Sequence, residues 1–202
     1  LGNLYGAAVP LNVSGAYDSA RSAYGRAIAL NPTSPQLQYL VAQLDIAHKD
    51  PKAAKNDLKQ AVALKADYTQ AIFFLSQLEV ADGNVKDALI SAEAAAYFTP
   101  NTPNILFPVG ILRAASGDLP GSVIALAGAV AANPSFANAR YFLAAVYAKQ
   151  KNYQDALTQI GAVAALSADN ATAVADIQTK LAAGKDPFPP NLLSVNPAPV
   201  SN

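Results

Sequence analysis

Few residues in this sequence could carry out catalysis. His48 is its one histidine, and cysteine is absent. A Ser-His-Asp or Cys-His site would therefore have to form around His48 alone, whose neighbours Lys49 and Asp50 are typical of a turn between helices. We expect His48 to be a solvated loop residue.

The acidic residues do not suggest a paired acid-base site either. Asp45, Glu79, Glu93 and Asp176 are single carboxylates scattered along polar faces, whereas acid-base catalysis needs two that converge. No glycine-rich phosphate loop occurs. We therefore predict no catalytic residue, no metal site and no cofactor, and we expect a protein that is not an enzyme.

Charge and hydropathy exclude two kinds of partner. Lys and Arg number 14, as do Asp and Glu, so the net charge is zero and the basic surface that binds nucleic acid is missing. The longest apolar stretch, around Val123 to Ala132, is too short for a transmembrane helix. Because the chain begins at Leu1 without a leader, we expect a mature product or a piece of a longer protein.

Small residues recur every 34 positions, and this period predicts a repeat array. One phase holds Ala20, Ala54, Ala88, Ser122 and Ala156, and a second holds Ala27, Ala61, Ala95, Ala129 and Val163. Within each unit, two segments carry apolar residues at helical spacing, as in Leu37, Leu40, Val41 and Leu44. Each unit is therefore expected to be a helical hairpin whose two helices approach closely at the small residues.

The pattern resembles the tetratricopeptide repeat family, whose 34-residue unit has small residues at places 8, 20 and 27, a bulky residue at place 24 and Pro at place 32. Place 8 here holds Ala8, Ala42, Ser76, Gly110 and Ala144, and place 24 holds Tyr24, Leu58, Ala92, Leu126 and Ile160. The resemblance implies an all-α, right-handed superhelical solenoid of helical hairpins that serves protein–protein interaction. It implies units at 1–34, 35–68, 69–102, 103–136 and 137–169, in a solenoid spanning 1–184.

Some segments depart from the family pattern. The family's early Trp is missing, Val163 replaces a small residue, and Pro10 and Pro108 fall inside expected first helices, the first of which spans residues 1–14, so these helices should be kinked or shortened. Residues 170–184 are expected to form a capping helix closed by Gly184.

Residues 185–202 form a Pro-rich tail that should be extended. The array with its tail also resembles, more loosely, the C-terminal region of bacterial membrane-anchored tetratricopeptide proteins. This second resemblance favours an extracellular or cell-envelope location over the cytoplasm.

In the family, places 2 and 5 of each unit face the concave groove. Place 2 holds a side-chain amide in Gln36, Gln70, Asn104 and Asn138, and place 5 holds an aromatic in Tyr5, Tyr39, Phe73, Phe107 and Tyr141. Rings beside amides suit an extended peptide, since amides donate to and accept from its backbone, and they would also suit a sugar. Alternatively, the rings pack on neighbouring first helices and only shape the solenoid.

The two ends of the chain suggest self-association. Leu4, Val9 and Leu11 give the first unit an apolar face without a polar cap, and the tail offers Phe188, Leu192 and Leu193. The leading hypothesis is an interaction scaffold that binds copies of itself head to tail, as a filament or tube subunit. The alternatives are an adaptor within a larger bacterial cell-envelope protein and, more weakly, a glycan-binding module. Asn12 and Asn170 begin sequons that could accept glycans in a secreted protein.

Overall fold

The structure is a computed structural model that describes residues 1–11, 13–189 and 199–201. Three residues singled out from the sequence, Asn12, Leu192 and Leu193, lie outside the described residues.

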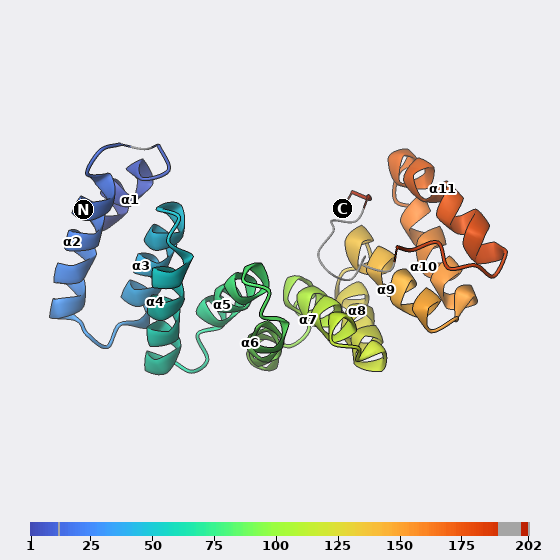
Figure 1. The fold of residues 1–202 in the computed structure, drawn as a ribbon, viewed down its shortest axis with the longest axis horizontal. Helices are drawn as coiled ribbons and strands as arrows, with labels where there is room; N and C mark the ends of the chain where they lie inside the picture. Colours follow the sequence, from blue (N-terminus) through green and yellow to red (C-terminus); the bar gives the residue numbers. More distant parts are fainter. Residues whose placement is uncertain (12, 190–198, 202) are drawn as a thin grey trace. The chain divides into compact units, whose positions relative to one another are not determined.

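The described residues fold into helices without strands. They form two compact units, Leu1–Phe98 and Thr99–Asn202 (Figure 1). The N-terminal unit contains α1 (Gly2–Ala8), α2 (Ala16–Leu30), α3 (Pro35–Ala47), α4 (Pro51–Leu64), α5 (Thr69–Ala81) and α6 (Val85–Phe98). The C-terminal unit contains α7 (Pro103–Ala115), α8 (Leu119–Ala132), α9 (Ala137–Lys149), α10 (Tyr153–Ala164) and α11 (Ala168–Ala182).

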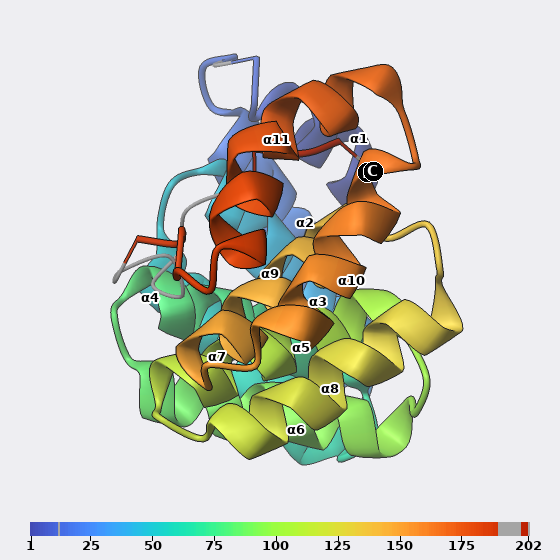
Figure 2. The ribbon, with the colours of Figure 1, turned by 90° about the vertical axis from the view of Figure 1, so that its right-hand side faces the viewer.

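Consecutive helices pair as hairpins, and within each unit every hairpin packs on the next. In the N-terminal unit the pairs are α1/α2, α3/α4 and α5/α6. In the C-terminal unit they are α7/α8 and α9/α10, and α11 packs on α10. Figure 2 turns this second unit toward the viewer, with α10 and α11 in front. The predicted hairpins are therefore present.

A residue in the left-handed backbone conformation ends the first helix of each of four hairpins. The residues are Lys49 (φ 64°), Gly83 (φ 75°), Gly117 (φ 87°) and Lys151 (φ 61°). The next N–H then reaches the carbonyl five residues back, as from Asp50 to Asp45 at 2.8 Å, which satisfies the helix end. The residue that follows the left-handed one also starts the second helix. In the second hairpin this residue is Asp50, whose side chain accepts from the Ala53 N–H at 2.9 Å.

Close contact between paired helices depends on the recurring small residues. Ala42, Ala54, Ala88 and Ala156 are completely buried. A Cβ on Gly110 would lie 2.5 Å from Leu126, so no larger residue fits there. Two hydroxyl groups bond across the hairpins, from Ser76 to the Ala88 carbonyl at 2.8 Å and from Ser122 to the Gly110 carbonyl at 2.7 Å.

Helix α1 is shorter than the expected first helix over residues 1–14 and ends before Pro10. It packs on α2 where the Tyr24 hydroxyl donates to Asn3 at 2.6 Å. Gly2 makes room for the Tyr24 ring, because a Cβ there would lie 2.8 Å from it. The complete first hairpin thus buries Tyr24.

Two other expectations about helix bounds need correction. Pro108 lies inside α7, which nevertheless continues to Ala115, so the expected shortening does not occur there. Helix α11 begins at Ala168, before the expected start at 170, because the Ser167 side chain caps it by accepting from the Asn170 N–H at 3.1 Å.

Lys49 carries a side chain in a conformation that glycine adopts without strain, which provides a test of the turn geometry. We expect Lys49→Gly to raise the free energy of unfolding by about 1 kcal/mol, measured by urea denaturation. The control is Lys59→Gly in the middle of α4, which should lower it by about 1 kcal/mol. A destabilised Lys49→Gly protein would contradict the role assigned to this turn.

Candidate functional site

The chain turns back onto the C-terminal unit after α11. Gly184 (φ 68°) ends the helix, with its N–H bonded to the Leu181 carbonyl at 2.9 Å and the Lys185 N–H bonded to the Lys180 carbonyl at 3.0 Å. The Asp186 side chain then accepts from the Phe188 N–H at 2.9 Å, forming a turn stabilised by an aspartate side chain. Residues 185–189 and 199–201 contain neither helix nor strand.

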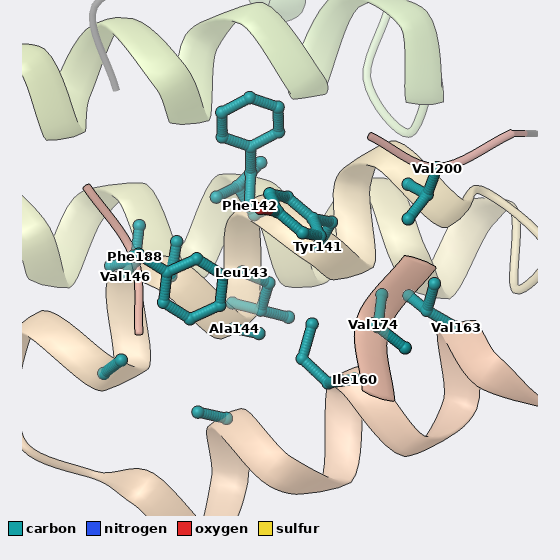
Figure 3. Close-up of a cluster of buried hydrophobic side chains, with 14 of the residues drawn as sticks. Tyr141, Phe142, Leu143, Ala144, Val146, Ile160, Val163, Val174, Phe188 and Val200 are labelled. Carbon is teal, nitrogen blue, oxygen red and sulfur yellow. The ribbon is translucent and has the colours of Figure 1, made fainter. Parts of the chain in front are cut away.

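Two tail side chains are buried in the core of this unit. Phe188 is 6% exposed and Val200 is 9% exposed. Both belong to the cluster formed by α9, α10 and α11, which includes Ile160 and Val174 (Figure 3). The Phe188 ring meets the Tyr141 ring of α9 edge to face, with centroids 5.4 Å apart and planes at 87°.

Asn170, in the first turn of α11, binds the backbone of the tail. Its Nδ2 donates to the Ser201 carbonyl at 3.0 Å, and its Oδ1 accepts from the Ser201 N–H at 2.9 Å. The Asn170 side chain binds the backbone of one residue, because its amide supplies a donor for the C=O of Ser201 and an acceptor for the N–H. Asn170, one of the two predicted glycan acceptors, is 2% exposed in the folded chain.

We call Tyr141 and Asn170, together with the apolar cluster between them, the tail site. Burial raises the pKa of Tyr141 above its ordinary value, so the phenol is neutral at physiological pH. The site offers an aromatic face at one end and a backbone-binding amide at the other. Sequence reasoning identified Tyr141 but missed Asn170 as a binding residue, because its partner Ser201 lies 31 residues away in the chain.

Two other rings of the predicted aromatic row serve packing between hairpins. Tyr39 contacts Tyr68 at 5.5 Å and Phe74 at 6.2 Å. In the same way, the Phe107 ring lies 5.2 Å from Phe136 and 5.6 Å from Phe142. Tyr39 and Phe107 thus each contact two aromatic residues of the next hairpin. One lies just before the first helix of that hairpin, and the other lies on this helix.

The other three rings of the aromatic row differ in how deeply they are buried. Tyr5 is 39% exposed, Phe73 is half-buried, and Tyr141 is buried. The α11 sequence contains no aromatic residue that could contact Tyr141, and Phe188 of the tail supplies that contact instead. The tail therefore gives Tyr141 the aromatic contact that the next repeat gives Tyr39 and Phe107.

The predicted amide row lies in differing surroundings. Gln36 accepts from the Tyr68 hydroxyl at 2.5 Å and so supports hairpin packing. Gln70 and Asn104 are exposed, and Asn138 is half-buried.

The predicted self-association residues divide into two groups. Leu4 is 70% exposed and Leu11 is 75% exposed, as expected of an open apolar face. Val9 is 7% exposed, within the core around Tyr24 and Leu44, and Phe188 lies in the core of the C-terminal unit. The expectation that Val9 and Phe188 are open to another copy is therefore wrong, because each is covered by its own chain.

Two carboxyl groups that were expected to be separate meet in the N-terminal unit. Asp45 is completely buried and Asp57 is 9% exposed. Arg21 Nη1 lies 2.5 Å from Asp45 Oδ1 and 3.8 Å from Asp57 Oδ2, and the Tyr17 hydroxyl donates to Asp45 at 3.0 Å. Burial, reinforced by the Asp45 carboxylate and opposed by Arg21, raises the pKa of Asp57 to about 6.

A hollow of about 350 Å³ lies beside Tyr17, whose hydroxyl binds Asp45. It is lined by Val9, Val13, Ser14, Gly15, Tyr17, Asp18 and His48. His48 is exposed, as expected, and its ring stacks on Tyr17 with centroids 3.7 Å apart. Among the described residues, no group of three His, Asp or Glu side chains could hold a metal ion. No described helix is both long and apolar enough to span a bilayer.

The stacked hairpins of each unit, with their small-residue contacts and left-handed turns, define an all-α repeat of the solenoid type. Residues 110–171 match the family model for the tetratricopeptide repeat. A comparison with curated proteins finds no significant match.

Solved structures with the same fold include three proteins at low sequence identity. YrrB, described as a tetratricopeptide protein with an unusual peptide-binding site, has 20% identity and a TM-score of 0.71 over 87% of this chain and 89% of its own. MamA has 15% identity and a TM-score of 0.69 over 85% and 94%. PilF of Pseudomonas aeruginosa has 14% identity and a TM-score of 0.65 over 90% and 87%. These similarities confirm the predicted fold class.

The raised pKa of Asp57 predicts a pH dependence of stability. Its folded pKa of about 6 lies above its ordinary value of 3.8, so the folded state binds the extra proton and stability falls as the pH rises from 4 through 6. We expect Asp57→Asn to remove most of this fall and to stabilise the protein at pH 7.5 by about 1–2 kcal/mol. Urea denaturation at pH 5 and pH 7.5 measures both effects.

The matched control is Asp67→Asn, which alters an exposed carboxylate of the same unit and should leave the wild-type pH profile unchanged. The interpretation fails if Asp57→Asn loses stability between pH 5 and pH 7.5 as much as the wild type does.

Proposed function

We propose that this chain is a tetratricopeptide protein-binding scaffold whose C-terminal unit holds an extended peptide segment at the tail site. The observation that carries the proposal is that a peptide segment already lies there: the chain's own Phe188 and Ser201 contact Tyr141 and Asn170. The description of YrrB as having an unusual peptide-binding site supports such a use of this fold.

The chemistry of the tail site favours polypeptide over other ligands. A side-chain amide that both donates and accepts is matched by the N–H and C=O of one residue of an extended segment. A net charge of zero gives phosphate backbones little attraction. A glycan is a weaker ligand, because Tyr39 and Phe107 are engaged in internal packing rather than free for sugar rings.

In the adaptor version of this function, the chain is a domain of a larger cell-envelope protein, and the bound segment comes from a different protein. The segment we expect carries an apolar side chain followed by a free backbone N–H and C=O, as Val200 and Ser201 do. The bound segment need not share the rest of the tail sequence, because Asn170 contacts only backbone atoms.

Selection from a library of random linear peptides displayed on phage tests the proposal on the intact chain. Enriched peptides would be synthesised and their dissociation constants measured by fluorescence polarisation. We expect Asn170→Ala to weaken binding about tenfold or more, because the ligand loses two hydrogen bonds at a buried site. The control is Asn104→Ala, which removes an exposed amide from α7 in the same unit.

Peptides that bind the wild type and Asn170→Ala equally well would refute the proposed site. Failure to enrich any peptide would refute the function as well. An effect of Asn104→Ala as large as that of Asn170→Ala would instead restore the predicted amide row as the binding surface.

We also propose self-association through the apolar end of the N-terminal unit. Leu1, Leu4, Leu11 and Val13 are 79%, 70%, 75% and 54% exposed, and exposed apolar residues gathered at one end favour a protein contact. A head-to-tail contact, joining this end of one copy to the last hairpin of the next, would build the filament expected from the sequence.

Replacing Leu4 and Leu11 together by Asp tests this second role. We expect the double variant to remain monomeric at concentrations where the wild type associates, as measured by sedimentation velocity. Leu30→Asp is the control, because Leu30 is 88% exposed but lies at the far end of α2. A wild type that is monomeric at high concentration would refute self-association.

A further inference from the structure

We propose that the tail of this chain is an intramolecular ligand that blocks the tail site, so that a partner segment enters only when the tail leaves. This inference rests on the proposed function, since it concerns the regulation of the same site. It assigns Val200 and Ser201 the role of competitors for Asn170.

The described tail is held at two separate places. Phe188 packs against Tyr141 on α9, and Ser201 is bound by Asn170 on α11. Between them the apolar cluster also takes in Val200. Figure 3 shows both tail side chains among the labelled residues of this cluster. The tail therefore covers the aromatic end and the amide end of the site together.

None of these contacts requires the tail's particular sequence. The Phe188 contact needs an aromatic or another large apolar side chain at the Tyr141 ring. The Asn170 contact needs only one residue with its N–H and C=O free. A partner segment with the same few features can replace the tail without new chemistry, which makes exchange between the two possible.

A permanent cap is the competing role for the tail. Phe188 supplies Tyr141 with the aromatic contact that Phe136 and Phe142 give Phe107, so the Phe188 end completes the last hairpin. The Val200–Ser201 end has no counterpart among the repeats, since it lies on the helix that follows the last hairpin. Val200 is consequently the residue whose substitution separates blocking from capping.

The strength of the block follows from competition within one chain. A tethered segment competes at an effective concentration in the millimolar range. If the tail occupies its site about nine-tenths of the time, an added peptide binds about tenfold more weakly than it would bind the open site. Releasing the tail should therefore strengthen the binding of an added peptide about tenfold.

The experiment uses the full chain and a fluorescein-labelled synthetic peptide with the sequence of residues 185–202. Val200→Asp should release the tail, because a carboxylate is costly to bury in an apolar cluster. We expect the peptide to bind this variant about tenfold more tightly than the wild type, measured by fluorescence polarisation. Pro199→Asp adds the same charge at the neighbouring exposed residue and should resemble the wild type.

Adding Asn170→Ala to Val200→Asp should abolish the gain, because the peptide then lacks its backbone partner. Equal affinity for the wild type and Val200→Asp would overturn the block while leaving the proposed function intact. No binding to any variant would overturn both. Circular dichroism at the working temperature confirms that each variant is folded.

Two further outcomes would also overturn the proposal. If Val200→Asp lowers the melting temperature sharply without a gain in peptide affinity, the tail is a structural cap. If sedimentation shows a wild-type dimer that Val200→Asp dissociates, the tail binds a second copy rather than its own chain.

Discussion

The close approach of the two helices in each hairpin is the constraint on which the rest of this structure depends. Side chains such as Ala42 and Ala54 are completely buried at these contacts, and Gly110 leaves no room for even a methyl group beside Leu126. Because such contacts admit few alternative registers, they fix which residues of the two helices face each other. The hydroxyl bonds of Ser76 and Ser122 to carbonyl groups of the opposite helix reinforce the same register.

The same register puts a polar residue near the end of the first helix in the hairpins that begin with α3, α5 and α7. Asp45, Glu79 and Arg113 are each 34 residues apart and find partners within their own surroundings. Asp45 binds Tyr17 and Arg21, Glu79 accepts from the Ser91 hydroxyl at 2.8 Å, and Arg113 donates to the Gly121 carbonyl at 3.4 Å. Buried polar groups are tolerated where such partners exist, and burial raises the pKa of Glu79 as it does that of Asp57.

The last hairpin shows how the array ends when no further repeat follows among the described helices. Helix α11 packs on α10 but brings no aromatic side chain to Tyr141. The turn at Gly184 and Asp186 redirects the chain, and Phe188 then covers the ring. A segment without helix or strand thus completes an apolar core and at the same time covers the amide of Asn170.

The repeats, the helical hairpins and their turns could be predicted from the sequence, because they depend on residues close together in the chain. Local rules predict the helix ends at Gly83 and Gly117. The pairing of Asp45 with Asp57, the use of Tyr39 and Phe107 in packing, and the binding of Ser201 by Asn170 emerge only in the folded chain. In each case the outcome depends on which distant groups become buried together, and no local pattern records the cost of burying polar atoms or the partners that offset it.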